Sequence, residues 1–301
     1  MTESVDSLQV GRGCEMANGQ LITVFAAKGG CGKTTLATNL ATVLYDRGAH
    51  RVCLFDLDLE FGDVAGVLGL RSARSMMDAL PHDAAGNPPY SDLPYGELPL
   101  GDLPYGDVSG GERSYGDLAP AGVRELMTPY RPGFDCLLAP TRPGEAALIP
   151  VSLVTRLLDV LPLLYDFVVV DTPSRFSTQV LAALDAADHH VLVTTPDRPA
   201  LKNLRATIDM LDLLQYDRTA RSIVVNRSDA AANLPASVLD ELVRSPIASH
   251  LPSWNGVPAS INRGEPLVAA DRDHPVSLAI RHLAAALLPS DGRCSRDPPP
   301  G

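Results

Sequence analysis

Apolar and polar residues follow two patterns along the chain, and the two patterns alternate. Short apolar runs, several of them rich in β-branched residues, predict buried strands at residues 21–26, 51–56, 136–139, 167–171, 190–194 and 222–225. Longer segments with helical periodicity lie at residues 33–46, 151–161, 178–186, 199–214, 236–244 and 276–288. Alternating strands and helices predict an α/β fold, a doubly wound and mostly parallel sheet with helices on both faces.

Two of the predicted strands end in an aspartate. Asp56 closes the run at 51–56, and Asp171 closes the run at 167–171. The carboxyl ends of parallel strands meet at one edge of an open sheet, which is also where ligands bind. We therefore expect both carboxylates at the ligand-binding edge.

The loop after the first predicted strand reads Ala27-Lys28-Gly29-Gly30-Cys31-Gly32-Lys33-Thr34-Thr35. A glycine-rich turn that opens a helix cradles phosphate, because its backbone N–H groups point at the phosphate oxygens. Lys33 would neutralise the β- and γ-phosphates, and the Thr34 hydroxyl would bind Mg²⁺. The pattern G-x-x-x-x-G-K-[ST] is not met, since Ala27 stands where its first glycine would be. The nucleotide-binding residues of this loop would be Gly29, Gly30, Cys31, Gly32, Lys33, Thr34 and Thr35.

The stretch K-G-G-x-G-K-T-T resembles the deviant Walker A signature of the MinD/ParA family. The resemblance implies a P-loop NTPase fold of the SIMIBI-like type, with ATP and Mg²⁺ as cofactors. It also implies that Lys28 reaches the nucleotide of the partner subunit in a homodimer that sandwiches ATP. A solvated loop lysine is the plain alternative for Lys28. Cys31 could act as a redox switch at a helix N-terminus, although we favour a small residue at the variable position.

The same resemblance gives roles to four further residues. Asp56 would organise the water shell of Mg²⁺, Asp58 would position the attacking water, and Asp171 would be the Walker B acid beside the metal. Asn226, at the end of the strand at 222–225, would bind the adenine. A helix cap for either of the first two acids, and a turn residue for Asp171 or Asn226, are the structural alternatives. The predicted catalytic residues are Lys28, Lys33 and Asp58, and the predicted metal ligands are Thr34, Asp56 and Asp171.

Further segments are similar to one branch of this family, the CpaE/TadZ-type pilus-assembly ATPases. They are Asp-Leu-Asp-Leu-Glu-Phe-Gly-Asp-Val-Ala at 56–65, Leu-Ala-Pro at 138–140, and the segments at 195–202 and 261–267. Many members of that branch carry a receiver-like domain before the ATPase, and the nineteen residues that precede the first strand leave no room for one.

Residues 88–119 interrupt the alternation with a five-residue repeat, whose units include Leu-Pro-Tyr-Gly-Glu and Leu-Pro-Tyr-Gly-Asp. Proline and glycine at fixed offsets exclude a regular helix. Six acidic residues and one arginine give this segment a net charge of −5. It could be a spacer, which we favour, or a docking segment for a partner. We expect a flexible leader at 1–19, one ATPase domain at 20–288 interrupted by this insert, and a disordered tail at 289–301.

Charge and cysteine content narrow the class of protein. A net charge of −11 argues against a standing affinity for DNA, although a basic surface on a dimer would still permit it. Five cysteines without C-x-x-C spacing argue against a disulfide framework or a structural zinc site, and fit the cytoplasm. No apolar stretch reaches membrane-spanning length, and we interpret the segment 276–288 as a core helix, so recruitment to a membrane or cell pole would need a partner.

These observations leave three functions open. The first is a slow ATPase switch that dimerises around ATP and positions a pilus-assembly or secretion machine, with a MinD-type role in cell division as its near relative. The second is a nucleotide-dependent scaffold with negligible turnover. The third is a DNA-partitioning ATPase of the ParA type.

Overall fold

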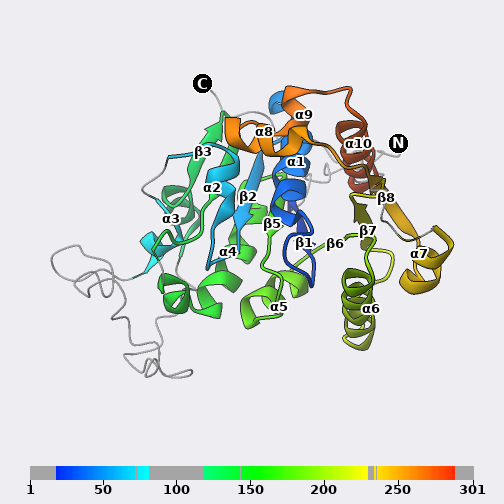
Figure 1. The fold of residues 1–301 in the computed structure, drawn as a ribbon. Helices are drawn as coiled ribbons and strands as arrows, with labels where there is room; N and C mark the ends of the chain where they lie inside the picture. Colours follow the sequence, from blue (N-terminus) through cyan, green and yellow to red (C-terminus); the bar gives the residue numbers. More distant parts are fainter. Residues whose placement is uncertain are drawn as a thin grey trace, which may run out of the picture.

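The structure is a computed structural model that describes residues 18–71, 74–80, 115, 118–142, 144–229, 234 and 236–288. An eight-stranded sheet runs through its middle, with helices on both sides (Figure 1). The strands are β1 (Gln20–Phe25), β2 (Val52–Asp56), β3 (Thr128–Arg131), β4 (Phe134–Leu137), β5 (Phe167–Asp171), β6 (His189–Thr194), β7 (Arg221–Asn226) and β8 (Ile247–Leu251). The α-helices are α1 (Lys33–Tyr45), α2 (Asp63–Val67), α3 (Pro120–Glu125), α4 (Val151–Leu164), α5 (Thr178–Asp185), α6 (Arg198–Leu213), α7 (Ala236–Val243), α8 (Gly256–Arg263), α9 (Leu267–Ala270) and α10 (Pro275–Leu287).

The strand order is β3-β4-β2-β5-β1-β6-β7-β8, and every neighbouring pair is parallel except β3 and β4. The first strand of the chain therefore lies inside the sheet, between β5 and β6. A parallel sheet of this kind needs crossover connections, which the helices supply. The predicted doubly wound, mostly parallel fold is confirmed.

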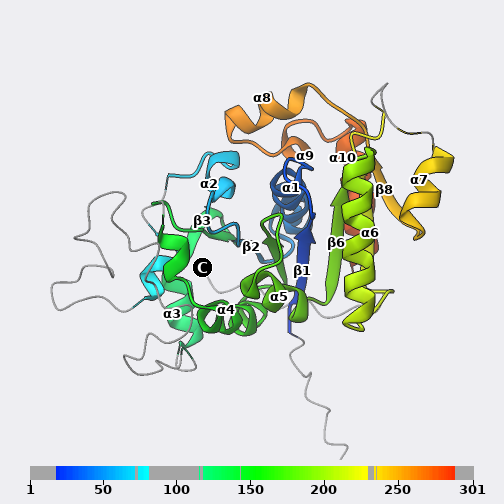
Figure 2. The same ribbon diagram turned by 60° about the horizontal axis from the view of Figure 1, so that its bottom comes forward.

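Hydrophobic residues alternate between the two faces of the sheet. On β1, Ile22 and Val24 face a cluster completed by α1, α9 and α10, whereas Leu21 and Phe25 face the opposite side. That opposite side is covered by α3 and α4 over one half of the sheet and by α6 and α7 over the other (Figure 2). Because both faces are buried, the central strands are apolar at nearly every position.

The predicted strands and helices lie close to the observed ones. The largest differences are at α4, which ends three residues beyond the expected segment, and at β4, which begins two residues before the expected run. The sequence patterns missed β3, β8 and the short helices α2, α3, α8 and α9. β3 is an edge strand that contains Pro129, which a strand tolerates where no neighbour needs its N–H group.

Most of the leader, the acidic repeat and the tail lie outside the described residues. Within the described ranges, every helix is too short or too polar to cross a membrane.

Candidate functional site

The register of three neighbouring strands brings the predicted site residues together. Asp56 at the end of β2 lies opposite Asp171 at the end of β5, and Asp171 lies opposite Val24 of β1. The glycine-rich loop begins directly after β1. The loop and the two aspartates therefore meet at the carboxyl edge of the sheet.

Two glycines of the loop adopt backbone conformations that other residues rarely adopt. Gly30 has a φ of +75° and Gly32 a φ of +94°. Gly32 precedes α1 and accepts a hydrogen bond on its carbonyl from Leu36 N. A Cβ atom at Gly32 would lie 2.5 Å from the Asn226 side-chain nitrogen, whereas one at Gly30 would meet open space. The chain wraps tightly around the start of α1, as a phosphate cradle requires.

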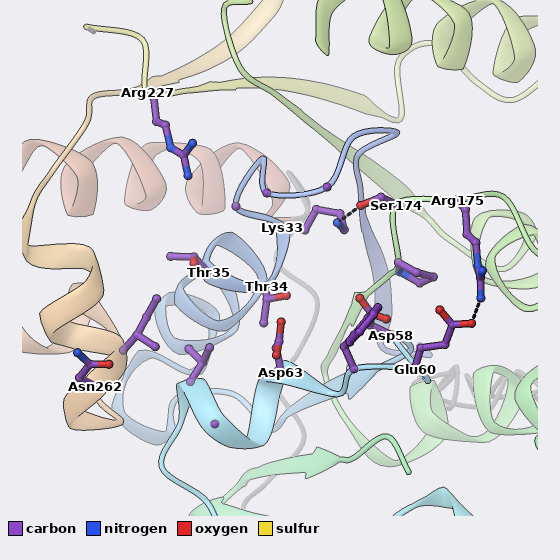
Figure 3. Close-up of a pocket in the computed structure, with 18 residues that line it drawn as sticks. Lys33, Thr34, Thr35, Asp58, Glu60, Asp63, Ser174, Arg175, Arg227 and Asn262 are labelled. Carbon is purple, nitrogen blue, oxygen red and sulfur yellow. Dashed lines mark hydrogen bonds and ion pairs between the residues drawn. The ribbon is translucent and has the colours of Figure 1, made fainter. Parts of the chain in front are cut away.

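A pocket of about 940 Å³ opens in front of this loop (Figure 3). It is lined by Gly29, Gly30, Gly32, Lys33, Thr34, Thr35, Asp58, Glu60, Phe61, Asp63, Gly66, Val67, Pro173, Ser174, Arg175, Arg227, Ile261 and Asn262. This volume is large enough for a nucleotide. Among the predicted residues, Lys28, Cys31, Asp56, Asp171 and Asn226 do not line it.

Lys33 lies at the first position of α1 and is 8% exposed. Its Nζ donates a hydrogen bond to Ser174 Oγ at 2.7 Å, across the pocket (Figure 3). A hydroxyl is a weak partner for a buried ammonium group, which an anion would satisfy better. Lys33 is therefore held in place and still available to a phosphate.

Asp56 and Asp171 form a buried pair of carboxylates. Asp56 accepts hydrogen bonds from the backbone N–H groups of Asp58 and Val64, both at 3.2 Å. Burial raises the pKa of both carboxyls; the charge of Asp171 raises the pKa of Asp56 further, whereas Thr34 and Lys33 partly offset the rise at Asp171. Within the described residues, both side-chain oxygens of Asp171 are buried without a hydrogen-bond partner of normal geometry.

The two Asp171 side-chain oxygens allow us to ask whether Mg²⁺ fits the site. Buried carboxylates normally have hydrogen-bond partners or a cation, and Asp171 lies at the strand end beside the loop that carries Thr34. The described part of the chain contains no group of three or more His, Cys, Asp or Glu side chains that could hold a metal alone. An ion held by one or two carboxylates and a hydroxyl, with phosphate oxygens completing its shell, fits both observations.

Asp58 is half-buried and faces the pocket. Burial raises its pKa, Lys33 lowers it, and Asp63 and Glu60 raise it. Glu60 forms an ion pair with Arg175 at the rim (Figure 3). The segment after β2 is thus tied to the segment after β5 across the pocket mouth.

Lys28 does not line the pocket and forms an ion pair with Asp197, with 2.8 Å between Nζ and Oδ1. Asp197 caps the N-terminus of α6, since the same oxygen accepts a hydrogen bond from Ala200 N. Each side chain is about 40% exposed. Lys28 is therefore bound to a residue of its own subunit, Asp197, and the ion pair is accessible to solvent.

Asn226 is hydrogen-bonded to the backbone of the glycine-rich loop at Cys31. Asn226 Nδ2 donates to the Cys31 carbonyl at 2.9 Å, and Asn226 Oδ1 accepts from Arg227 N. The Cys31 side chain is buried, as are the other described cysteines, Cys53 and Cys136. Burial favours the interpretation of Cys31 as a small packing residue over that of a redox switch.

A smaller cavity of about 340 Å³ adjoins the pocket and shares Gly32, Thr35 and Arg227 with it. Asn226 and Trp254 also line it.

Sequence reasoning missed Ser174, Glu60, Arg175, Arg227 and Asn262, which line the pocket. Ser174 and Arg175 follow Asp171 closely, and Glu60 follows Asp58, so their nearness to predicted acids was the available signal.

Comparison with known proteins agrees with this geometry. The family model described as "CobQ/CobB/MinD/ParA nucleotide binding domain" matches residues 22–267. The septum site-determining protein MinD of Synechocystis is 24% identical over 280 residues, which are 90% of either chain. The structure of MinD from Pyrococcus horikoshii, complexed with Mg-ADP, has a TM-score of 0.66 at 18% identity and covers 88% of this chain and 94% of that one.

A ParA family ATPase from Chlorobium tepidum has a TM-score of 0.71 at 18% identity, covering 88% of this chain and 98% of that one. These two structures share the fold. The family model spans most of the chain, including the loop, both buried aspartates and Asn226, and on that ground the protein belongs to the CobQ/CobB/MinD/ParA family of nucleotide-binding domains.

Proposed function

We propose that this protein is a MinD/ParA-type switch that binds ATP with Mg²⁺, dimerises around it and hydrolyses it. The observation that carries the proposal is one pocket lined by Lys33, Thr34 and Asp58, with the Asp171 carboxylate buried nearby and without a hydrogen-bond partner of normal geometry among the described residues. Membership of a nucleotide-binding family of ATPases supports it.

Each residue has a distinct task in this proposal. Lys33 exchanges the Ser174 hydroxyl for phosphate oxygens, and the loop N–H groups bind the remaining phosphate charge. Thr34, Asp171 and Asp56 would hold Mg²⁺ and its water shell, and the bound ion would supply charge compensation. Asp58, the acid exposed to the pocket, orients the attacking water. The protein contributes placement and electrostatics, which phosphoryl transfer needs most.

The adjoining cavity is the proposed site of the base. It lies beside Gly32 and Thr35, and Trp254 gives it an aromatic side chain on which a purine can stack. Both polar atoms of the Asn226 amide are engaged in the structure. Base recognition by Asn226 would therefore use the second N–H group of its amide as donor, or its oxygen as acceptor of a second hydrogen bond.

Phosphate release by purified protein separates a switch from a scaffold. We expect ATP turnover in the wild type, none above background in Lys33→Ala, and a loss of about 10²- to 10³-fold in Asp58→Ala with nucleotide binding retained. Binding of a fluorescent ATP analogue is the parallel measurement. Equal background release by all three proteins, with tight binding by the wild type, would instead indicate a scaffold.

The machine served is a finer proposal. The segments at 56–65, 138–140, 195–202 and 261–267 support a pilus-assembly role of the CpaE/TadZ type. Similarity to MinD over 90% of the chain supports a division-site role at least as well. A deletion strain distinguishes them, because loss of surface pili with normal septa fits the first and misplaced septa fit the second.

The partitioning alternative, suggested by the ParA-like fold, predicts ATP-dependent DNA binding that falls steeply with salt. No binding at low salt would remove it.

A further inference from the structure

A second concave surface lies away from the nucleotide pocket, between α6 and α7. The two helices share the hydrophobic cluster that covers this end of the sheet, and they lie side by side in both views (Figures 1 and 2). The groove between them has a volume of about 860 Å³. It is lined by Arg198, Pro199, Leu201, Lys202, Asn203, Arg205, Asp209, Glu241, Leu242 and Arg244.

The charge of this groove is opposite to that of the chain. Four of its lining residues are basic and two are acidic, in a protein whose net charge is −11. Arg198, Lys202 and Arg205 follow one another at spacings of four and three residues, which places them on one face of α6.

Two of these cations have no partner within the described part of the chain. Arg205 pairs with Asp209 at 2.6 Å, and Arg244 donates to the Glu241 carbonyl at 3.2 Å. Arg198 and Lys202 are exposed and form no hydrogen bond or ion pair with any described residue. The unpaired positive charge is therefore concentrated where α6 begins.

The groove also has an apolar floor. The exposed Pro199 and the half-buried Leu242 provide this apolar surface, and the fully buried Leu201 packs beneath them. The phosphate backbone of a nucleic acid would be repelled by the carboxylates of Asp209 and Glu241, and it has no apolar group to bury against this floor. A peptide can place carboxylates at Arg198 and Lys202 and an apolar side chain on the floor, as acidic motifs do on basic clusters.

We propose that the α6–α7 groove docks an acidic segment of a partner protein, in which carboxylates alternate with apolar residues. Two contacts connect this groove to the nucleotide loop. Asn203, which lines the groove, donates to the Ala27 carbonyl at 3.1 Å, and Asp197, one residue before Arg198, holds Lys28. Through these contacts, a peptide bound in the groove would alter the rate of ATP hydrolysis. This second part of the proposal rests on the proposed ATPase function.

Binding is tested without nucleotide, so that it does not depend on the ATPase proposal. The probe is a fluorescent twelve-residue peptide in which Glu alternates with Leu and Tyr, and its control has Gln in place of every Glu. We expect anisotropy to report binding of the Glu peptide only, weakened about tenfold in Arg198→Glu/Lys202→Glu. Arg263→Glu/Arg272→Glu, which reverses two charges at exposed arginines outside the groove, is the matched control and should bind like the wild type.

A second measurement uses the unaltered protein. Bound peptide should slow acylation of Lys202 by an amine reagent, measured by mass spectrometry, while the exposed Lys202 of the free protein reacts readily. The proposal is wrong if the Gln peptide binds equally well, if charge reversal leaves affinity unchanged, or if Lys202 is not protected. If a 20-base-pair DNA duplex displaces the fluorescent Glu peptide at a lower concentration than unlabelled Glu peptide does, the groove binds nucleic acid and the proposal is wrong.

ATP turnover is measured last. The Glu peptide should change the rate of ATP hydrolysis by the wild type. Asn203→Ala, which loses the hydrogen bond to Ala27, should still bind the peptide, and its rate of ATP hydrolysis should not respond to it. Binding without any ATP turnover would contradict the proposed function and leave the docking groove intact.

Discussion

Lys28 Nζ lies 2.8 Å from Asp197 Oδ1, and 169 positions of the chain separate the two residues. Although partial burial opposes it, the hydrogen bonds from Lys28, Thr195 and Ala200 lower the pKa of Asp197. A lysine proposed to act on a partner subunit is thus neutralised on its own subunit first. Dimerisation would have to break this ion pair.

Asp197→Asn should therefore strengthen ATP-dependent dimerisation, because the amide can still cap α6 and no longer holds the lysine by charge. An exposed ion pair contributes about 0.2 to 1 kcal/mol and a symmetric dimer breaks two of them, so we expect the dimer dissociation constant to fall about two- to thirtyfold. Light scattering with ATP measures it. Lys28→Ala should stay monomeric, and Asp209→Asn, a change to another ion-paired carboxylate of α6, should behave like the wild type. A weaker dimer in Asp197→Asn would mean that the pair does not restrain Lys28.

Gly30 and Gly32 provide a comparison within one loop. Alanine at Gly30 faces open space and has only its positive φ to accommodate, for a cost of about 1 kcal/mol in unfolding free energy. Alanine at Gly32 also meets Asn226 Nδ2, so we expect a loss of about 2 to 3 kcal/mol. Urea unfolding measures both. Adding Asn226→Ala should recover part of the Gly32→Ala loss, and no recovery would show that the clash is not the cause.

Much of this architecture could be predicted because local patterns determine it. The apolar runs that end in Asp56 and Asp171 placed both acids at the correct edge of the sheet, since strand direction alone decides that edge. β8 and α8 were missed because β8 has the small and polar residues Ala248, Ser249 and His250 at its centre and so lacks an apolar run, and α8 has little buried surface of its own. β8 and α8 are stabilised by contacts with residues far away in the chain, and a local sequence pattern cannot predict such contacts.

The contacts within the site were less predictable than its residues. The Glu60–Arg175 ion pair joins residues 115 positions apart, and Lys33 reaches Ser174 over 141 positions. Such pairs depend on loop conformation after the strands, which residue type does not determine. The sequence could indicate a lysine for phosphate, and it could not indicate which hydroxyl that lysine contacts first.

Asp171→Asn should separate stability from function. The carboxylate is buried beside Asp56 and has no hydrogen-bond partner of normal geometry among the described residues, so removing its charge should stabilise the nucleotide-free protein by about 1 to 3 kcal/mol. The same change removes a proposed magnesium ligand, so the rise in melting temperature on adding Mg-ADP should disappear. Thermal unfolding in EDTA and in Mg-ADP measures both effects.

Asp63→Asn is the control for this change, since Asp63 lines the same pocket at an exposed position. It should leave both melting temperatures within about 1 °C of the wild type, as surface substitutions usually do. A variant Asp171→Asn that is less stable in EDTA would mean that the carboxylate has a favourable partner in the nucleotide-free protein.

His189 should make stability depend on pH. It lies at the start of β6 with Nε2 2.9 Å from Ser222 Oγ, and burial, together with the charge of His190, lowers its pKa from 6.5 to about 4. The folded protein therefore disfavours protonation relative to the unfolded chain. The stability that this neutral histidine contributes is fully present above pH 6.5 and is lost as the pH falls toward 4.

Between pH 7 and pH 5 we expect a loss of about 1 to 2 kcal/mol from this residue, measured as the shift in urea unfolding free energy. Other groups titrate in the same range, so the informative quantity is the difference between the wild type and His189→Gln, which keeps a polar group near Ser222. The variant should lose less stability on acidification than the wild type. His282→Gln, on the exposed face of α10, should lose as much as the wild type. Equal losses in all three proteins would show that His189 is protonated without cost in the folded state, and would place the origin of any acid sensitivity elsewhere in the fold.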